Sequence, residues 1–164
     1  MIVEKLENLI SPDINRLGFI LWGVEIIDGT KNNNIMTARI YIDNENGISL
    51  DHCQQVSEIV GILLDLEKFF PNPYILEVSS PGRNRRIFTA LQAIKFIGSE
   101  VKIRLINNKN MLHNKHRRFK GFITRVVEKE VMLQTETGSI NFNFSNIEKM
   151  IVVPKLWSNS KGKG

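Results

Sequence analysis

The sequence predicts an α+β protein of two small domains, an α-β-β-α-β amino-terminal domain and a small five-stranded β-barrel. Three observations support this prediction. Helical and strand patterns alternate in the first half of the chain, short strands dominate the second half, and the charge changes sign between the halves. The expected boundaries are 1–82 for the first domain, 83–153 for a linker, a short helix and the barrel, and 154–164 for a basic, disordered tail.

The first predicted helix covers residues 2–17 and ends before Gly18. Its buried face follows from apolar residues that recur every three or four positions, namely Val3, Leu6, Ile10, Ile14 and Leu17. Pro12 lacks an amide hydrogen and is therefore expected to kink or split this helix. Two strands should follow, over residues 19–27 and 35–42, and the polar segment between them indicates a hairpin.

Ser49 is expected to cap a second helix, with Asp51 in the first turn near the positive end of the helix dipole. The predicted buried stripe of this helix consists of Cys53, Val56, Ile59, Val60, Leu63 and Leu66. Cys53 therefore reads as a packed thiol and not as a nucleophile. A single cysteine also excludes an internal disulfide and fits a reducing cytoplasm.

The segment between the domains combines a strand, a turn and a run of arginines. A buried strand is predicted over residues 74–78. Ser80, Pro81 and Gly82 should form a structural turn, since proline cannot donate to a strand ladder and glycine accepts a positive φ. Arg83, Arg85 and Arg86 follow on a segment expected to face solvent, where they could hold a polyanion.

Five short strands are predicted beyond this segment, over residues 101–105, 117–127, 131–135, 140–144 and 150–153. Thr89 should cap a short helix containing Leu91, Ile94 and Ile97, and residues 145–147 should form a one-turn corner. Gly121 fits the sharp bend that closing a small barrel requires. The pattern therefore indicates a barrel of the SH3-like or Sm-like type.

Charge separates the two halves. Residues 1–82 contain 5 basic and 12 acidic side chains, whereas residues 83–164 contain 17 basic and 5 acidic ones. This asymmetry favours nucleic-acid contact by the second half and contact with something else, such as a basic protein, by the first. The candidate RNA-binding residues are Arg83, Arg85, Arg86, Lys102, Arg104, Lys115, Arg117, Arg118 and Lys120. A merely solvated loop remains the alternative for the basic stretch 109–120.

The sequence contains no arrangement typical of an enzyme. Ser79 and Ser80 lack the glycine pattern of a nucleophile elbow and a partnered base. His113 and His116 have no third metal ligand in their loop, so neither metal nor cofactor is expected. No apolar run approaches the ~20 residues that cross a bilayer, so no membrane partner is expected.

Several segments together resemble the bacterial ribosome maturation factor RimP family. They are Gly18-Phe19, Gly23-Val24-Glu25, Tyr41-Ile42-Asp43, residues 47–53, the specific string Leu76-Glu77-Val78-Ser79-Ser80-Pro81-Gly82, and Phe119-Lys120-Gly121. The resemblance spans about residues 2 to 153. After the Pro-Gly turn the family usually has Leu-Asp-Arg-Pro, whereas this chain has Arg83-Asn84-Arg85-Arg86, so only Arg85 matches by position.

The resemblance implies an α/β domain followed by an Sm-like barrel, in a cytoplasmic, non-enzymatic and monomeric factor. Such a factor would bind the immature 30S subunit through 16S rRNA and assist its late assembly, including incorporation of a small-subunit ribosomal protein near the decoding region. One alternative is an Sm-like regulator that forms an oligomeric ring around single-stranded RNA. An enzyme acting on RNA is disfavoured because no catalytic constellation is present.

Overall fold

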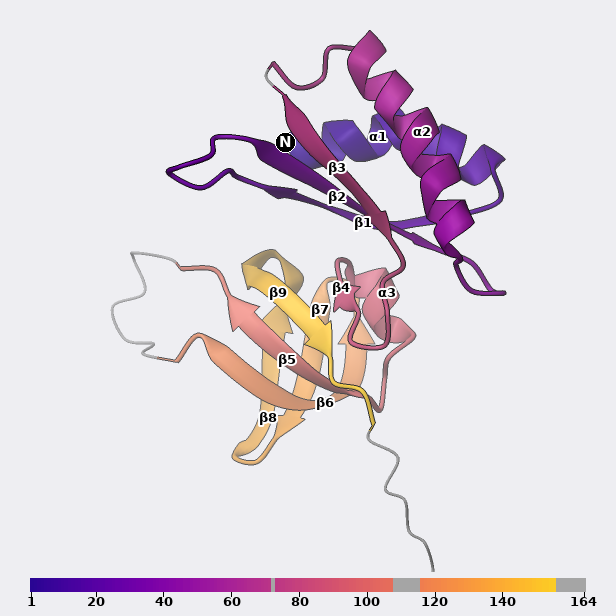
Figure 1. The fold of residues 1–164 in the computed structure, drawn as a ribbon. Coiled ribbons are helices and arrows are strands. Elements are labelled where there is room, and N and C mark those ends of the chain that lie inside the picture. Colours follow the sequence, from indigo (N-terminus) through magenta and orange to yellow (C-terminus); the bar gives the residue numbers. More distant parts are fainter. Residues whose placement is uncertain (72, 108–115, 156–164) are drawn as a thin grey trace, which may run out of the picture. The chain divides into compact units, whose positions relative to one another are not determined.

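The computed structural model describes residues 1–71, 73–107 and 116–155 (Figure 1). These residues form three helices and two sheets, so the predicted α+β class is confirmed. They group into two compact units, Met1–Pro81 and Gly82–Gly164. No helix of the described part has both the length and the apolar character needed to cross a membrane.

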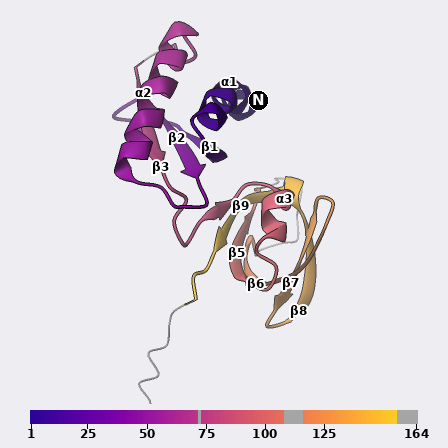
Figure 2. The ribbon, with the colours of Figure 1, turned by 90° about the vertical axis from the view of Figure 1, so that its right-hand side faces the viewer.

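The amino-terminal unit consists of α1 (Ile2–Arg16), β1 (Ile20–Ile27), β2 (Met36–Asp43), α2 (Leu50–Leu66) and β3 (Tyr74–Ser79), in the predicted order. β2 is the central strand and pairs antiparallel with β1 and parallel with β3. α1 packs against β1, α2 packs against β3, and the helices contact each other. Both helices therefore cover the same face of the sheet (Figures 1 and 2).

The core of this unit lies between the sheet and the two helices. Ala38, Ile40 and Ile42 are fully buried, because alternate side chains of β2 point to the helix-covered face. The helices contribute Leu6, Ile10, Ile14, Val56, Val60 and Leu64, each at most 1% exposed. The apolar side chains of the helices and of β2 thus pack in one layer. The buried residues of α1 are those that its apolar spacing predicted.

Two details of the helices differ from the prediction. α1 is not split at Pro12 but runs without interruption to Arg16. Ile10 and Ile14 on either side of the proline are fully buried, so packing holds the helix together despite the missing hydrogen bond. Leu66, expected in the buried stripe of α2, is 74% exposed, because Leu64 and Phe70 fill the core at that end.

α2 begins at a reciprocal capping box. The Ser49 hydroxyl accepts a hydrogen bond from the His52 amide at 3.2 Å, and the His52 Nδ1 accepts one from the Ser49 amide at 3.1 Å. Histidine takes the place of the more usual Glu or Gln at this position. Cys53 is the next residue of the helix. Its side chain packs against the core, and burial raises its pKa. A raised pKa disfavours the reactive thiolate, in keeping with a packing role.

Tyr74, at the start of β3, is expected to titrate late. Its hydroxyl donates to Asp65 at 2.9 Å, and burial together with this bond raises the pKa of Tyr74 to about 12. The neutral phenol is favoured in the folded state. Its contribution to stability is therefore complete below pH about 10 and is lost as the pH rises through about 12. Tyrosinate absorbance of the wild type minus that of Tyr74→Phe measures this step. A difference signal complete near pH 10 would contradict the assignment.

The carboxy-terminal unit contains one curved sheet of six antiparallel strands in the order β4-β9-β5-β6-β7-β8 (Figures 1 and 2). Its elements are β4 (Arg86–Ile87), α3 (Ala90–Ile94), β5 (Glu100–Leu105), β6 (Arg118–Val127), β7 (Glu130–Thr135), β8 (Gly138–Asn143), a 3-10 turn (Phe144–Asn146) and β9 (Ile147–Val152). Its core includes Val101, Ile103, Ile123, Leu133 and Met150.

β5 to β9 correspond to the five predicted strands, and the 3-10 turn is the predicted corner. The prediction of five strands is incomplete, because β4 adds a sixth strand of only two residues. In the described part of the chain, β4 and β8 are the edges of the sheet and no strand pair joins them. Thr89 caps α3, but this helix stops at Ile94 and Ile97 lies beyond it.

Candidate nucleic-acid interface

The outer face of β5, β6 and β9 brings basic side chains from three strands together. Alternation along β5 turns Lys102 and Arg104 outward. The strand register places Lys120 and Arg118 of β6 opposite them, and Lys149 of β9 opposite Arg104. These five residues, which we call the cationic face, line an open hollow of ≈ 470 Å³. Four of the five were predicted as RNA-binding candidates, and Lys149 was not.

Members of the cationic face differ in how far their charge is neutralised. Lys120 lies 3.0 Å from the Glu100 carboxylate, and Arg104 is held by a carboxylate of β9. Lys102, Arg118 and Lys149 form no ion pair with another residue of the described part. A phosphate that approaches these three cations displaces counterions and not a protein carboxylate. These three residues are the strongest candidates for contact with the phosphate backbone of a nucleic acid.

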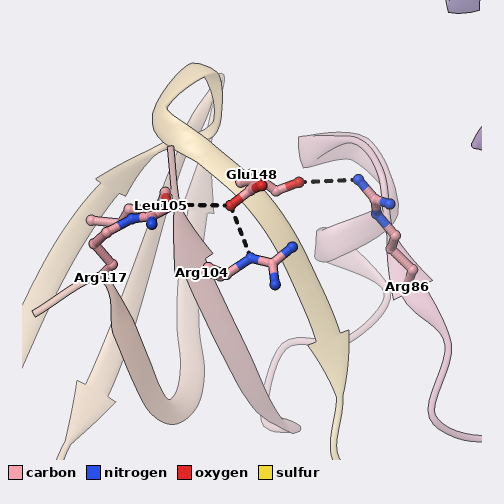
Figure 3. Close-up of polar contacts among 5 residues, drawn as sticks. All are labelled: Arg86, Arg104, Leu105, Arg117 and Glu148. Carbon is pink, nitrogen blue, oxygen red and sulfur yellow. Dashed lines mark hydrogen bonds and ion pairs between the residues drawn. The ribbon is translucent and has the colours of Figure 1, made fainter. Parts of the chain in front are cut away.

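Glu148 of β9 holds arginines from three separate segments (Figure 3). Its Oε2 lies 2.8 Å from the Arg104 Nε and 3.2 Å from the Arg117 Nη2, and its backbone carbonyl accepts from the Arg86 Nη2 at 3.0 Å. The Arg117 guanidinium also donates to the Leu105 carbonyl at 3.0 and 3.2 Å. Exposed ion pairs of this kind each contribute about 0.2–1 kcal/mol. The main effect of Glu148 is therefore to orient two guanidinium groups and to share one negative charge between them.

Glu148→Gln is expected to strengthen RNA binding. The amide keeps the shape of the side chain but releases Arg104 and Arg117 from a competing negative charge. Affinity should rise by about fivefold at ~0.1 M salt. The slope of log affinity against log salt concentration should become steeper by about one. The free energy of unfolding should fall by only about 1 kcal/mol. Fluorescence anisotropy over a salt series measures the change, and lower affinity in a folded variant would show that Glu148 supports the interface instead of limiting it.

The arginines after the domain boundary have different surroundings. Arg83 is exposed. Arg85 is partly buried, donates to the Gly82 carbonyl at 3.3 Å, and lies 6.0 Å from the Phe96 ring centre. The Arg86 guanidinium lies 4.8 Å from the Phe88 ring centre in addition to its bond to β9. Arg86 was predicted as a phosphate contact on an exposed segment, but it is partly buried and anchors β4.

The remaining predicted residues belong to the turn and to the basic loop. Ser80 is exposed, Pro81 is buried, and Gly82 has φ of +72°, a left-handed conformation that favours glycine. Lys115 and His113, with the rest of residues 108–115, lie outside the described residues, as do residues 156–164 of the tail. Among the described residues no three His, Cys, Asp or Glu side chains gather as a metal site would require.

Charges on the sheet of the amino-terminal unit form a cross-strand cluster. Arg39 of β2 lies 2.7 Å from Glu77 of β3 and 3.5 Å from Glu25 of β1, and Glu25 accepts from the Tyr41 hydroxyl at 3.3 Å. The hydrogen bond to Glu77 raises the pKa of Arg39, so its charge persists. Two carboxylates around one guanidinium leave this cluster negative, in line with the acidic composition of the unit.

The amino-terminal sequence matches a known domain family. Residues 9–84 fit the family model described as the RimP N-terminal domain. The match begins within α1, includes the whole three-stranded sheet and α2, and ends just after the turn at Gly82. The amino-terminal unit therefore contains a RimP N-terminal domain, and this match supports the RimP family for the chain.

Proposed function

We propose that the chain binds the immature 30S subunit and promotes its late assembly, with the cationic face in contact with 16S rRNA. The observation that carries this proposal is the convergence of Lys102, Arg118 and Lys149 from three strands onto one face, next to arginines held by Glu148. Clustered Lys and Arg neutralise phosphates and release counterions, which supplies affinity without reading sequence.

The mechanism is differential binding without bond chemistry. A factor that binds one conformation of the rRNA more tightly than another shifts the particle towards the first by the ratio of the two affinities. In this proposal the chain acts as a cytoplasmic monomer. Its acidic amino-terminal unit contacts a basic small-subunit ribosomal protein near the decoding region. In the same proposal the carboxy-terminal sheet is a partly open barrel of the Sm-like type, and it presents the cationic face.

Sedimentation with purified particles tests the maturation role. The protein should pellet with 30S assembly intermediates at moderate salt and more weakly with mature 30S and 70S particles. Intermediates and mature particles should be compared at equal concentration and ionic strength, because electrostatic binding depends steeply on salt. Equal binding to all three particles would leave general RNA affinity and remove the preference on which the mechanism depends.

The free edges of the carboxy-terminal sheet favour a second function. β4 and β8 are the outer strands in the described part of the sheet, and edge strands can pair between copies of a chain. Such pairing would permit a ring around single-stranded RNA. Sedimentation equilibrium separates the two proposals, since a ring must be several times heavier than the 18.8 kDa chain. A monomer at micromolar concentration would exclude the ring.

A further inference from the structure

A small cavity opens beside the cationic face, at the end of β5 and β6 and next to β8. Its volume is ≈ 270 Å³, slightly below the ~300–1,000 Å³ typical of ligand pockets. This size suits one planar ring system and excludes a folded segment of RNA or protein. The lining residues used in the argument below are Arg117, Phe119, Ile140, Asn141, Phe142 and Asn146.

The floor of the cavity is apolar and aromatic. The Phe119 and Phe142 rings have centroids 5.0 Å apart and an interplanar angle of 60°, an edge-to-face arrangement that fixes both rings. Phe142 is buried, while Phe119 and Ile140 are partly exposed and reachable from the cavity. A half-exposed aromatic ring is a stacking surface for any nucleobase, since every base has a π-face.

The rim of the cavity carries amide groups. The Asn146 backbone carbonyl accepts from the Ile106 amide at 2.9 Å, which fixes this residue at the end of the 3-10 turn. Its side-chain amide forms no hydrogen bond within the part of the chain that the structure describes, whereas the Asn141 amide already donates to Glu130 at 2.9 Å. An amide offers both a donor and an acceptor, which matches the edge of a base.

Basic side chains line the surface that joins the cavity to the cationic face. Arg117 and His116 line both the cavity and an adjoining hollow of ≈ 490 Å³, whose other lining residues are Arg104, Arg118 and Glu148. None of the described residues that line the cavity carries a carboxylate. We propose that the cavity between Phe119, Ile140 and Asn146 binds one unpaired nucleobase of an RNA strand whose phosphates lie on the cationic face. This inference rests on the proposed function and adds that the preferred RNA is single-stranded at this point.

The chemistry favours a nucleobase over the aromatic side chain of a protein. A basic protein would meet Arg118 and His116 in the adjoining hollow, where Glu148 is already paired with Arg104 and Arg117. An RNA strand satisfies the cations with its phosphates and the amide with its base, so one ligand uses both features. A base held in an A-form helix is stacked and paired, and it cannot enter a cavity of this size.

Anisotropy titrations with single-stranded and double-stranded RNA of equal phosphate number test the proposal. The full chain should bind the single strand about tenfold more tightly, because stacking of one base contributes roughly 5-fold to 150-fold in affinity. Asn146→Ala and Phe119→Leu should each remove most of this preference while leaving duplex affinity and its salt dependence unchanged. Asn8→Ala, on the exposed side of α1, is the matched control and should change neither.

Phe119 also packs against the core, so the test does not depend on that variant alone. Addition of uridine monophosphate to the wild type should shift the side-chain amide resonances of Asn146 more than those of Asn141.

Equal affinity for both RNA forms, unchanged by Asn146→Ala, would overturn the cavity proposal and leave the cationic face intact. Binding of neither RNA would overturn the proposed function as well. Loss of ribosomal-protein binding in the cavity variants, with RNA binding unchanged, would assign the cavity to a peptide and also overturn it.

Discussion

Replacement of Lys102, Arg118 and Lys149 by glutamine is expected to weaken binding to 30S assembly intermediates about 100-fold at ~0.1 M salt. These are the cations of the cationic face that form no ion pair with another described residue, so each is available to one phosphate. Each lost contact reduces the slope of log affinity against log salt by about 0.7–0.9, which makes the slope shallower by about two to three.

The matched control replaces Lys95, Arg125 and Lys129 by glutamine. All three are exposed cations of the same unit outside the cationic face, so the net charge changes equally. This variant should lose only a few-fold in affinity through the weaker overall field. Similar losses in the two variants would mean that net charge, and not the arrangement of cations on β5, β6 and β9, determines binding.

Gly121→Ala is expected to destabilise the carboxy-terminal unit by about 3 kcal/mol. A Cβ atom at Gly121 would lie 2.5 Å from the backbone oxygen of Gln134 and 3.0 Å from its carbonyl carbon. Both are backbone atoms of the neighbouring strand β7, so relief of the clash requires the two strands to separate at this point. The midpoint of thermal unfolding for this unit should fall by roughly 15 °C.

Gly61→Ala provides the control for a glycine replaced without a clash. Gly61 lies within α2, and the nearest atom to a Cβ there is the Leu76 Cδ2 at 3.9 Å, an ordinary contact. The variant should stabilise the amino-terminal unit by about 0.5–1 kcal/mol, because alanine has the higher helix propensity.

Amide hydrogen exchange measures the stability of each of the two units separately. Unchanged protection of β6 and β7 in Gly121→Ala would show that the strands can separate at little cost.

The elements of the fold follow largely from local patterns in the sequence. Apolar spacing located α1 and α2. Short apolar runs or alternation located the strands of both sheets except β4, to within a few residues. β4 could not be predicted, because a strand of two residues is too short to show an alternating pattern. From the sequence alone, Arg86 was expected to be a solvent-exposed charge. A split of the first helix at Pro12 was one of the two expected outcomes and is not found, because tertiary packing of Ile10 and Ile14 outweighs the local penalty.

The candidate site could be predicted only in part. Lys102 and Arg104 were recognised because they alternate with buried residues on a single strand. Lys149 was missed because the last strand was expected to begin at Met150, whereas β9 begins at Ile147. The role of Glu148 depends on arginines that are 31 and 44 residues away in sequence, and no local pattern links them.

Cross-linking of the chain to the rRNA of 30S assembly intermediates, followed by identification of the linked peptides, tests the central claim most directly. Peptides containing residues 100–105, 118–127 and 147–152 should carry the nucleotide adducts, with most adducts on the segments around Lys102, Arg118 and Lys149. Adducts confined to the amino-terminal unit, with none on β5, β6 or β9, would contradict the assignment of the cationic face as the RNA-binding surface.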